Sequence, residues 1–253
     1  MKIRNLLGVV AGALTIAALV AESGTATAGS RCGVDVTGNG GYTYAGHQSS
    51  DRGHGVRATI TATRALQVSG AGHVAGWVGV GGPGQGAGGE DAWIQVGVGS
   101  VYGTEPFLYA EITRPGRYPK FMLLEEKLQV DESRSVAVLE IAGRPGWWRI
   151  WVDGNPVTKP VKLRGSSGRW TPIATAESFS GGEVVCNSFA FRFERVLVSH
   201  GPGGAWQPFE SAHRFLDRGY RLQALATAPA DENARRPASR GSNPLPYAFV
   251  ASS

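Results

Sequence analysis

The sequence has little of what metal sites, redox sites and serine hydrolases need. It contains only two cysteines and two methionines among 253 residues. Its five histidines lack the spacing of a zinc site such as His-Glu-x-x-His. The Gly-x-Ser-x-Gly turn that carries the nucleophile of α/β-hydrolases does not occur in the sequence either. We therefore expect no metal and no cofactor.

Long apolar runs are scarce as well. The one clear run, residues 6–20, follows Lys2 and Arg4 and precedes the small residues Ala-Thr-Ala at 26–28, as in a secretory signal peptide. The run is too short for a typical membrane span. We predict a signal peptide over residues 1–28 and a secreted, monomeric product with no membrane association after cleavage. The formal net charge of +5 is small and spread along the chain, which argues against a nucleic-acid partner.

The two cysteines of an exported chain predict a single disulfide. Cys32 follows the predicted cleavage site closely, and Cys186 lies far along the chain. Exported proteins with an even number of cysteines usually pair them. A Cys32–Cys186 bridge would close a loop of roughly 150 residues and stabilise the fold by up to about 5 kcal/mol. Two free thiols are the alternative.

Glycine is abundant instead, with 37 residues, and no long helical pattern is present. This composition favours short strands joined by tight turns. About ten predicted strands follow one another at intervals of roughly 10 to 15 residues with turn residues between them, as in antiparallel sandwiches. We predict an all-β jelly-roll sandwich over 29–200 and a coil-rich tail over 201–253, whose last apolar piece is a candidate to dock on the sheet. The predicted strands are 42–47, 56–63, 75–80, 92–98, 107–113, 133–141, 147–152, 156–163, 170–179 and 189–198, and residues 120–130 fit a strand or a short helix.

The most informative stretch is a predicted hairpin of two apolar strands, 75–80 and 92–98. In the second strand, the period of two places Trp93 and Gln95 on one face and the aliphatic residues at 94, 96 and 98 on the other. The aliphatic face should contact the core. Gln95 would then lie beside Trp93 on the opposite face, where a ligand could bind.

The loop between these two strands contains six residues, 84–89, that fit the pattern G-x-G-x-x-G. A dinucleotide site needs a helix after the glycines and a βαβ unit around them. Here the next predicted element is a strand. We interpret the segment as a flexible loop at the mouth of a groove.

Three polar residues stand among apolar or aromatic neighbours in predicted strands: Gln95, Glu111 and Glu177. A buried side chain of this kind needs a partner, so these are the candidate functional residues. Solvent-facing strand positions are the alternative. A core of this size cannot hold all of the tryptophans. We therefore predict that some of them line a surface suited to sugars or extended peptides. These tryptophans are Trp77, Trp93, Trp147, Trp148, Trp151 and Trp170.

The order of these motifs resembles that of the glutamic peptidases (eqolisins). The segments AGWVGVGG (75–82) and WIQVGV (93–98) are similar to the family's Trp-Val-Gly-Ile-Asp-Gly and Ile-Leu-Gln-Thr-Gly-Val strands. Tyr-Ala-Gly at 44–46 is similar to its Trp-Ala-Gly, and Leu-Tyr-Ala-Glu at 108–111 to its Trp-Tyr-Glu. The resemblance covers residues 40–198. It implies a concanavalin-A-like sandwich of two curved antiparallel sheets.

The resemblance also implies a possible chemistry. In this family a glutamate activates water as a general base, and a glutamine amide stabilises the oxyanion. Gln95 matches the glutamine directly. Glu177 matches the glutamate if the following loop is shortened, whereas without a gap Ile173 takes its place and cannot activate water. The two positions share strand parity, so alternation does not choose between them.

Two functions follow as hypotheses. The first is a non-catalytic protein that binds an extended glycan or peptide in a groove on the concave sheet. Its contact residues would be Trp93, Gln95, Tyr109 and Glu111. The alternative is an acid-acting endopeptidase with Gln95 and Glu177 as the catalytic pair. A secreted structural domain without a groove is a third possibility.

Overall fold

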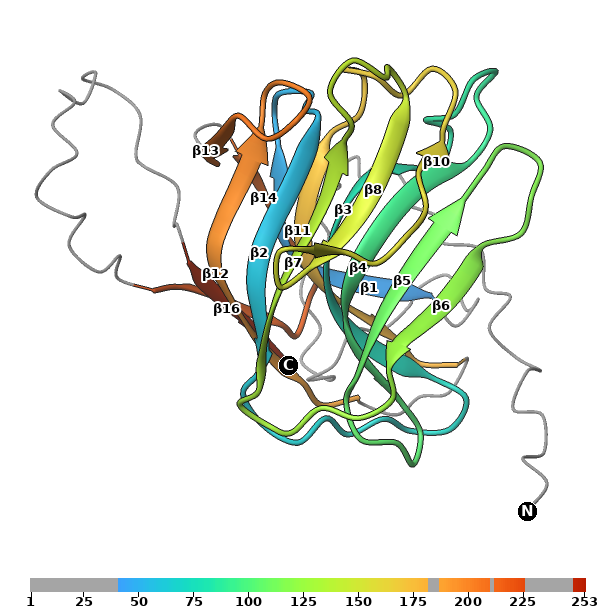
Figure 1. The fold of residues 1–253 in the computed structure, drawn as a ribbon. Helices are drawn as coiled ribbons and strands as arrows, with labels where there is room; N and C mark the ends of the chain where they lie inside the picture. The colour runs from blue at the N-terminus through green and yellow to red at the C-terminus, as the bar shows by residue number, and fades with distance from the viewer. Residues whose placement is uncertain (1–40, 182–186, 210–211, 226–247) are drawn as a thin grey trace, which may run out of the picture.

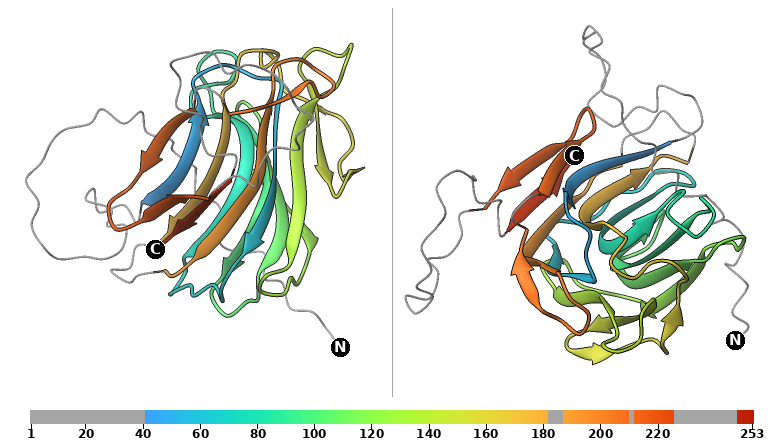
Figure 2. Two further views of the ribbon diagram at one scale, coloured as in Figure 1. Left: turned by 90° about the vertical axis from the view of Figure 1, so that its left-hand side faces the viewer. Right: turned by 90° about the horizontal axis from the view of Figure 1, so that it is seen from above.

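The computed structural model describes residues 41–181, 187–209, 212–225 and 248–253. These residues form two antiparallel β-sheets that face one another (Figures 1 and 2). Within the described ranges no helix is long and apolar enough to span a membrane. The predicted signal peptide, Cys32 and Cys186 lie outside the described residues. The all-β, concanavalin-A-like sandwich predicted from the sequence is confirmed.

The two sheets differ in size. The first sheet has seven strands, in the order β14 (Ala212–Leu216), β1 (Tyr42–Ser49), β11 (Pro172–Phe179), β3 (His73–Gly82), β4 (Ala92–Val101), β5 (Phe107–Thr113) and β6 (Lys120–Glu125). The second has nine, along the path β10 (Val161–Lys162), β8 (Trp147–Val152), β7 (Ser133–Glu140), β2 (Gly55–Ala62), β12 (Ala190–Ser199), β16 (Phe249–Ser252) and β15 (Arg221–Ala224), with β13 (Trp206–Pro208) beside β12 and β9 (Asn155–Pro156) beside β8. The sequence of residues 120–130 fitted a strand or a short helix. In the structure, strand β6 forms the first part of this segment.

The main core lies between the sheets and consists of the aliphatic and aromatic faces predicted from alternation. On β4 the side chains of Ile94, Val96 and Val98 are at most 1% exposed. On the opposite sheet Phe191 and Phe193 of β12 are fully buried. Removing this apolar surface from water is the main driving force that holds the two layers together.

The segment after His200, for which a coil-rich tail is predicted, adds strands to both sheets. Its described parts contribute the strands β13, β14, β15 and β16. Strand β14 pairs with β1, and β16 pairs with both β12 and β15. The described residues Phe249–Ser252 therefore belong to the second sheet. Residues 226–247 of the predicted tail lie outside the described residues.

His47 of β1 is a buried titratable group within the sandwich. It is 6% exposed and packs edge-on against Phe249, with ring centroids 4.8 Å apart. Burial, assisted by the nearby charge of Arg214, lowers the pKa of His47 from 6.5 to about 4. The folded protein therefore holds this imidazole neutral at pH values where the unfolded chain protonates it.

Acidification should consequently destabilise the native protein through His47. As pH falls from 6.5 to 4, the unfolded chain takes up a proton that the folded chain does not. A His47→Leu variant should gain about 3 kcal/mol of stability relative to the native protein over this interval, because it has no group to protonate. Urea unfolding at several pH values measures this difference. A stability difference that stays constant with pH would contradict the assignment.

Candidate functional site

A second, smaller hydrophobic cluster lies on the face of the seven-stranded sheet that is turned away from the main core, which we call the outer face. Strand alternation places there every second residue of β11, β3, β4 and β5. The polar candidates Gln95, Glu111 and Glu177 lie on the same face. The buried members of the cluster are Ala75, Trp77, Trp93, Tyr109 and Ile173, with Tyr42, Tyr44 and Phe107 packed against them.

The strand register places Ile173 in the same row as Gln95. Ile173 of β11 pairs with Gly79 of β3, and Gly79 pairs with Gln95 of β4. Gly79 has no side chain, and a Cβ added there would lie 2.8 Å from the Cβ of Gln95. Ile173 is therefore the residue on β11 that stands opposite Gln95, about 10 Å away across two strand spacings.

Glu177 lies further along β11, in a different row. It pairs with Ala75 of β3, four residues from Ile173, which corresponds to about 13 Å along the strand. Its carboxylate accepts hydrogen bonds from His73 Nε2 (2.9 Å) and Trp77 Nε1 (3.1 Å) and is 2% exposed. The structure thus places Gln95 and Glu177 on one face but does not bring them together.

Glu111 is the acidic residue that directly adjoins Gln95. The two residues are paired across β4 and β5, where opposite side chains are about 5 Å apart at Cβ. Trp93 Nε1 donates to Glu111 Oε1 over 2.7 Å. Burial raises the pKa of Glu111 to about 7. The Trp93 hydrogen bond lowers this pKa, and the charge of Glu177 adds a smaller increase. At acidic pH this carboxyl group is therefore protonated.

The side chains predicted to contact a ligand lie next to one another, but they are not presented to solvent. Gln95 is 3% exposed, and its Nε2 donates a long hydrogen bond of 3.5 Å to the hydroxyl oxygen of Tyr109. Trp93, Tyr109 and Glu111 are between 4% and 6% exposed. The expectation of an open groove above them is not met at these positions, because the large aromatic side chains of the outer face cluster with the polar ones. The partnership of Glu177 with His73 had no sequence signal, since 104 residues separate the two.

Two exposed apolar side chains of the outer face lie on β6, the last strand of the sheet. Phe121 pairs with Glu111 and Leu123 with Tyr109, so all four side chains share the outer face. Phe121 is 41% exposed and Leu123 is 49% exposed. The Phe121 ring stacks on Tyr109, with centroids 5.5 Å apart and planes inclined by 11°. We call Phe121 and Leu123 the β6 surface. The sequence did not predict this surface, because residues 120–130 fitted both a strand and a short helix.

Nothing in the described part of the chain suggests a metal centre, since no group of three or more His, Cys, Asp or Glu side chains there could hold an ion. The chemistry available on the outer face is that of a carboxyl group with a raised pKa beside an amide, and of a separate carboxylate held by an imidazole and an indole.

Comparison with solved structures places the fold beside known peptidases. The backbone is similar to that of Scytalido-glutamic peptidase with a peptide-based transition state analog, with a TM-score of 0.55 and 16% identity over 83% of this chain and 97% of that chain. A second structure of scytalido-glutamic peptidase, with a transition state analog inhibitor, has a TM-score of 0.55 and 14% identity, again over 83% of this chain and 97% of that chain. At this identity the likeness establishes the fold. No protein-family model matches the sequence, and no curated protein is significantly similar to it.

Proposed function

We propose that this chain is a secreted protein that binds an extended glycan or peptide along the outer face of the seven-stranded sheet without cleaving it. The observation that carries the proposal is the register of β11. Ile173, and not Glu177, stands opposite Gln95. An isoleucine cannot take a proton from water, so the general base that the glutamic-peptidase resemblance would require is missing from this position.

The two glutamates of the outer face do not readily replace that base. Glu177 is about 13 Å along β11 from the position opposite Gln95, and its carboxylate is engaged by His73 and Trp77. Glu111 adjoins Gln95, but its raised pKa leaves it protonated at acidic pH, where it cannot accept a proton. These two features support binding over acid hydrolysis.

The β6 surface is the proposed point of contact. Phe121 and Leu123 are exposed apolar side chains on the face that carries Gln95 and Glu111. Strand β6 is also the last strand in the order of its sheet. An extended peptide can pair with such an edge, and a sugar ring can stack on an exposed aromatic ring. Both ligands would lie along the strand.

The second candidate function is an acid-acting endopeptidase that uses Gln95 and Glu177. The similarity of fold to Scytalido-glutamic peptidase favours it, as does the shared face of the two side chains. This function requires β11 to shift by four residues, or one substrate molecule to reach both Gln95 and Glu177. We therefore rank it below binding.

Ligand binding can be tested by tryptophan fluorescence. Trp93 contacts Glu111, which pairs with Phe121, so a ligand on the β6 surface should perturb its emission. We expect at least one member of a panel of oligosaccharides and extended peptides to bind, and a Phe121→Ala/Leu123→Ala double variant to weaken that binding about tenfold.

The matched control is Val157→Ala, because Val157 is 39% exposed and follows β9 of the other sheet. It should leave the affinity unchanged. The proposal fails if no member of the panel binds, or if the control weakens binding as much as the β6 double variant does.

A further inference from the structure

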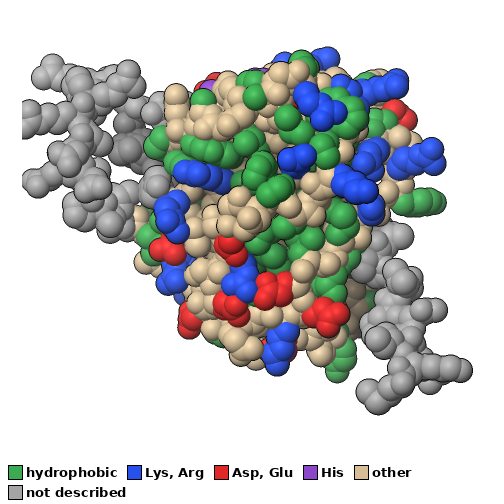
Figure 3. Space-filling model, in the orientation of Figure 1, with side chains coloured by type: hydrophobic (Ala, Val, Ile, Leu, Met, Phe, Trp, Pro, Cys, Tyr) green, Lys and Arg blue, Asp and Glu red, His purple; other side chains and the backbone are tan. Residues whose placement is uncertain are grey.

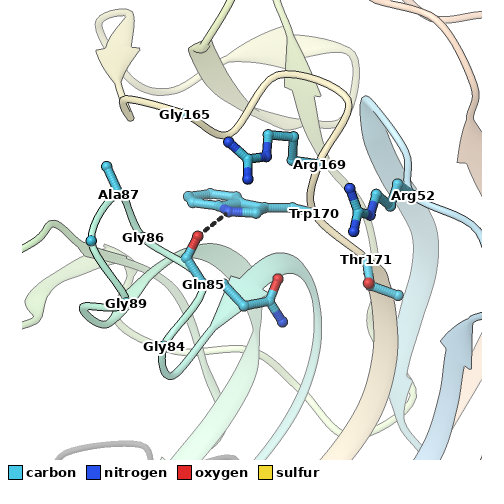
Figure 4. A pocket seen from close by; sticks show the side chains of 11 residues that line it. Arg52, Gly84, Gln85, Gly86, Ala87, Gly89, Gly165, Arg169, Trp170 and Thr171 are labelled. Atoms are coloured by element: carbon cyan, nitrogen blue, oxygen red, sulfur yellow. Dashed lines mark hydrogen bonds between the residues drawn. The ribbon is translucent and has the colours of Figure 1, made fainter.

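The loops at one end of the sandwich enclose a pocket that is separate from the outer face. Its volume is about 490 Å³, and it is lined by the glycine-rich segment 84–89, by Gly165, by Arg169, Trp170 and Thr171, and by Arg52 (Figure 4). This volume falls within the range of small-molecule sites. None of the side chains assigned to the outer face lines it, so the inference below does not depend on the proposed function.

Buried indoles hold the walls of this pocket in place. Trp170 is 1% exposed and donates from Nε1 to the carbonyl oxygen of Gln85 over 2.9 Å, which ties the glycine-rich loop to the opposite wall. Trp170 also stacks on Trp148, with centroids 5.9 Å apart. Trp148 in turn donates to Ser166 Oγ over 2.7 Å. The Trp170 hydrogen bond therefore connects the two walls of the pocket, and the contacts of Trp148 support the Trp170 ring from behind.

The backbone brings the two arginines to the same wall. Gly53, next to Arg52, donates its N–H to the carbonyl oxygen of Trp170, next to Arg169, over 2.8 Å. Figure 4 shows the two guanidinium groups and the Thr171 side chain facing the glycine-rich loop and Gln85 across the pocket. Segments that are more than 100 residues apart in sequence thus place two positive charges at one opening.

The pocket is electrostatically unbalanced. No Asp or Glu side chain lines it, and neither Arg52 nor Arg169 makes a salt bridge with the described part of the chain. Both side chains are exposed. Figure 3 shows Lys and Arg side chains gathered over the upper part of the molecule, where these loops lie, and most Asp and Glu side chains below. Two guanidinium groups without counter-charges attract an anion, which each can bind in bidentate geometry.

We propose that this pocket binds the carboxylate or sulfate group of an acidic saccharide. The two guanidinium groups would hold the anionic substituent. The Gln85 amide, the Thr171 hydroxyl and the loop backbone supply donors and acceptors for ring hydroxyls. A hydrophobic peptide side chain fits less well, because among the described lining residues Ala87 is the one exposed apolar side chain and the Trp170 ring is buried.

Calorimetric titration of the full chain tests this proposal. The probes are trigalacturonate, a sulfated heparin disaccharide, fully methyl-esterified trigalacturonate and sodium sulfate. The methyl ester keeps the sugar backbone and removes the charge, and sodium sulfate supplies an anion without a sugar. We expect binding of trigalacturonate or the heparin disaccharide, weakened about tenfold by Arg52→Gln and by Arg169→Gln, and weaker at high salt.

Arg221→Gln is the control, since Arg221 is an exposed arginine on β15 of the other sheet. It should leave the affinity unchanged, and circular dichroism should show that all three variants fold like the native protein. Binding of the methyl ester or of free sulfate as tightly as the acidic sugars would overturn the proposal. So would the failure of both acidic sugars to bind, or equal losses of affinity in all three variants.

Discussion

A Glu111→Gln variant should gain about 3 kcal/mol of folding stability relative to the native protein as pH rises from 4.5 through 7. Burial raises the pKa of Glu111 from 4.5 to about 7 in the folded protein. Over this interval the unfolded chain releases the proton while the folded chain still holds it. The native protein therefore loses stability with rising pH, and the glutamine variant, which has no proton to release, does not.

The comparison between variants is needed because His47 acts in the opposite direction. Its lowered pKa makes the native protein gain stability as pH rises from about 4 to 6.5. In the native protein the two effects overlap and partly cancel. The difference between the native protein and Glu111→Gln isolates the glutamate, and chemical unfolding at a series of pH values measures it.

An exposed glutamate provides the control. The Glu105 side chain is 59% exposed. Glu105→Gln should shift stability by less than about 0.5 kcal/mol at every pH, as is usual for solvated surface groups. If the stability difference between Glu111→Gln and the native protein were as flat with pH as that of Glu105→Gln, Glu111 would have an ordinary pKa. The outer face would then be more hydrated than the structure indicates.

The faces of the strands could be predicted from the sequence because alternation is a local property. The burial of Ile94, Val96 and Val98 follows from a period of two within β4, and so does the placement of Trp93 and Gln95 on the other face. The same dependence on local alternation explains why the sequence of β6 fitted both a strand and a helix. Its side chains at 121 and 123 are apolar yet exposed, so the usual contrast between a buried and a solvated face is absent.

The site depended on strand pairing, which a single sequence does not specify. Ile173 and Glu177 have the same parity, and only the register of β11 against β3 and β4 decides which of them stands opposite Gln95. A slip of an even number of residues preserves the buried face, so alternation alone does not reveal it. The arginine pocket is non-local in the same way, because the bridge between Gly53 and Trp170 joins two distant segments and places Arg52 and Arg169 at one pocket.

The presence of Ile173 on β11, where the glutamic-peptidase resemblance calls for a water-activating carboxylate, should have an all-or-none consequence at acidic pH. A positioned general base typically contributes a factor of about 10² to 10⁴ in rate, so its replacement by Ile173 should leave peptide cleavage undetectable. Glu111 does not compensate at acidic pH, where it is protonated. We expect the native protein to bind extended ligands and release them unchanged.

The most direct measurement is incubation of the protein with a denatured protein substrate across acidic and neutral pH, beside an acid peptidase of known activity. The variants Gln95→Ala, Glu111→Gln and Glu177→Gln are assayed in parallel. The account predicts no cleavage by the native protein and no difference among the four proteins. Cleavage that disappears in Gln95→Ala together with either glutamate variant would contradict it, and would show that a carboxylate does reach the glutamine during turnover.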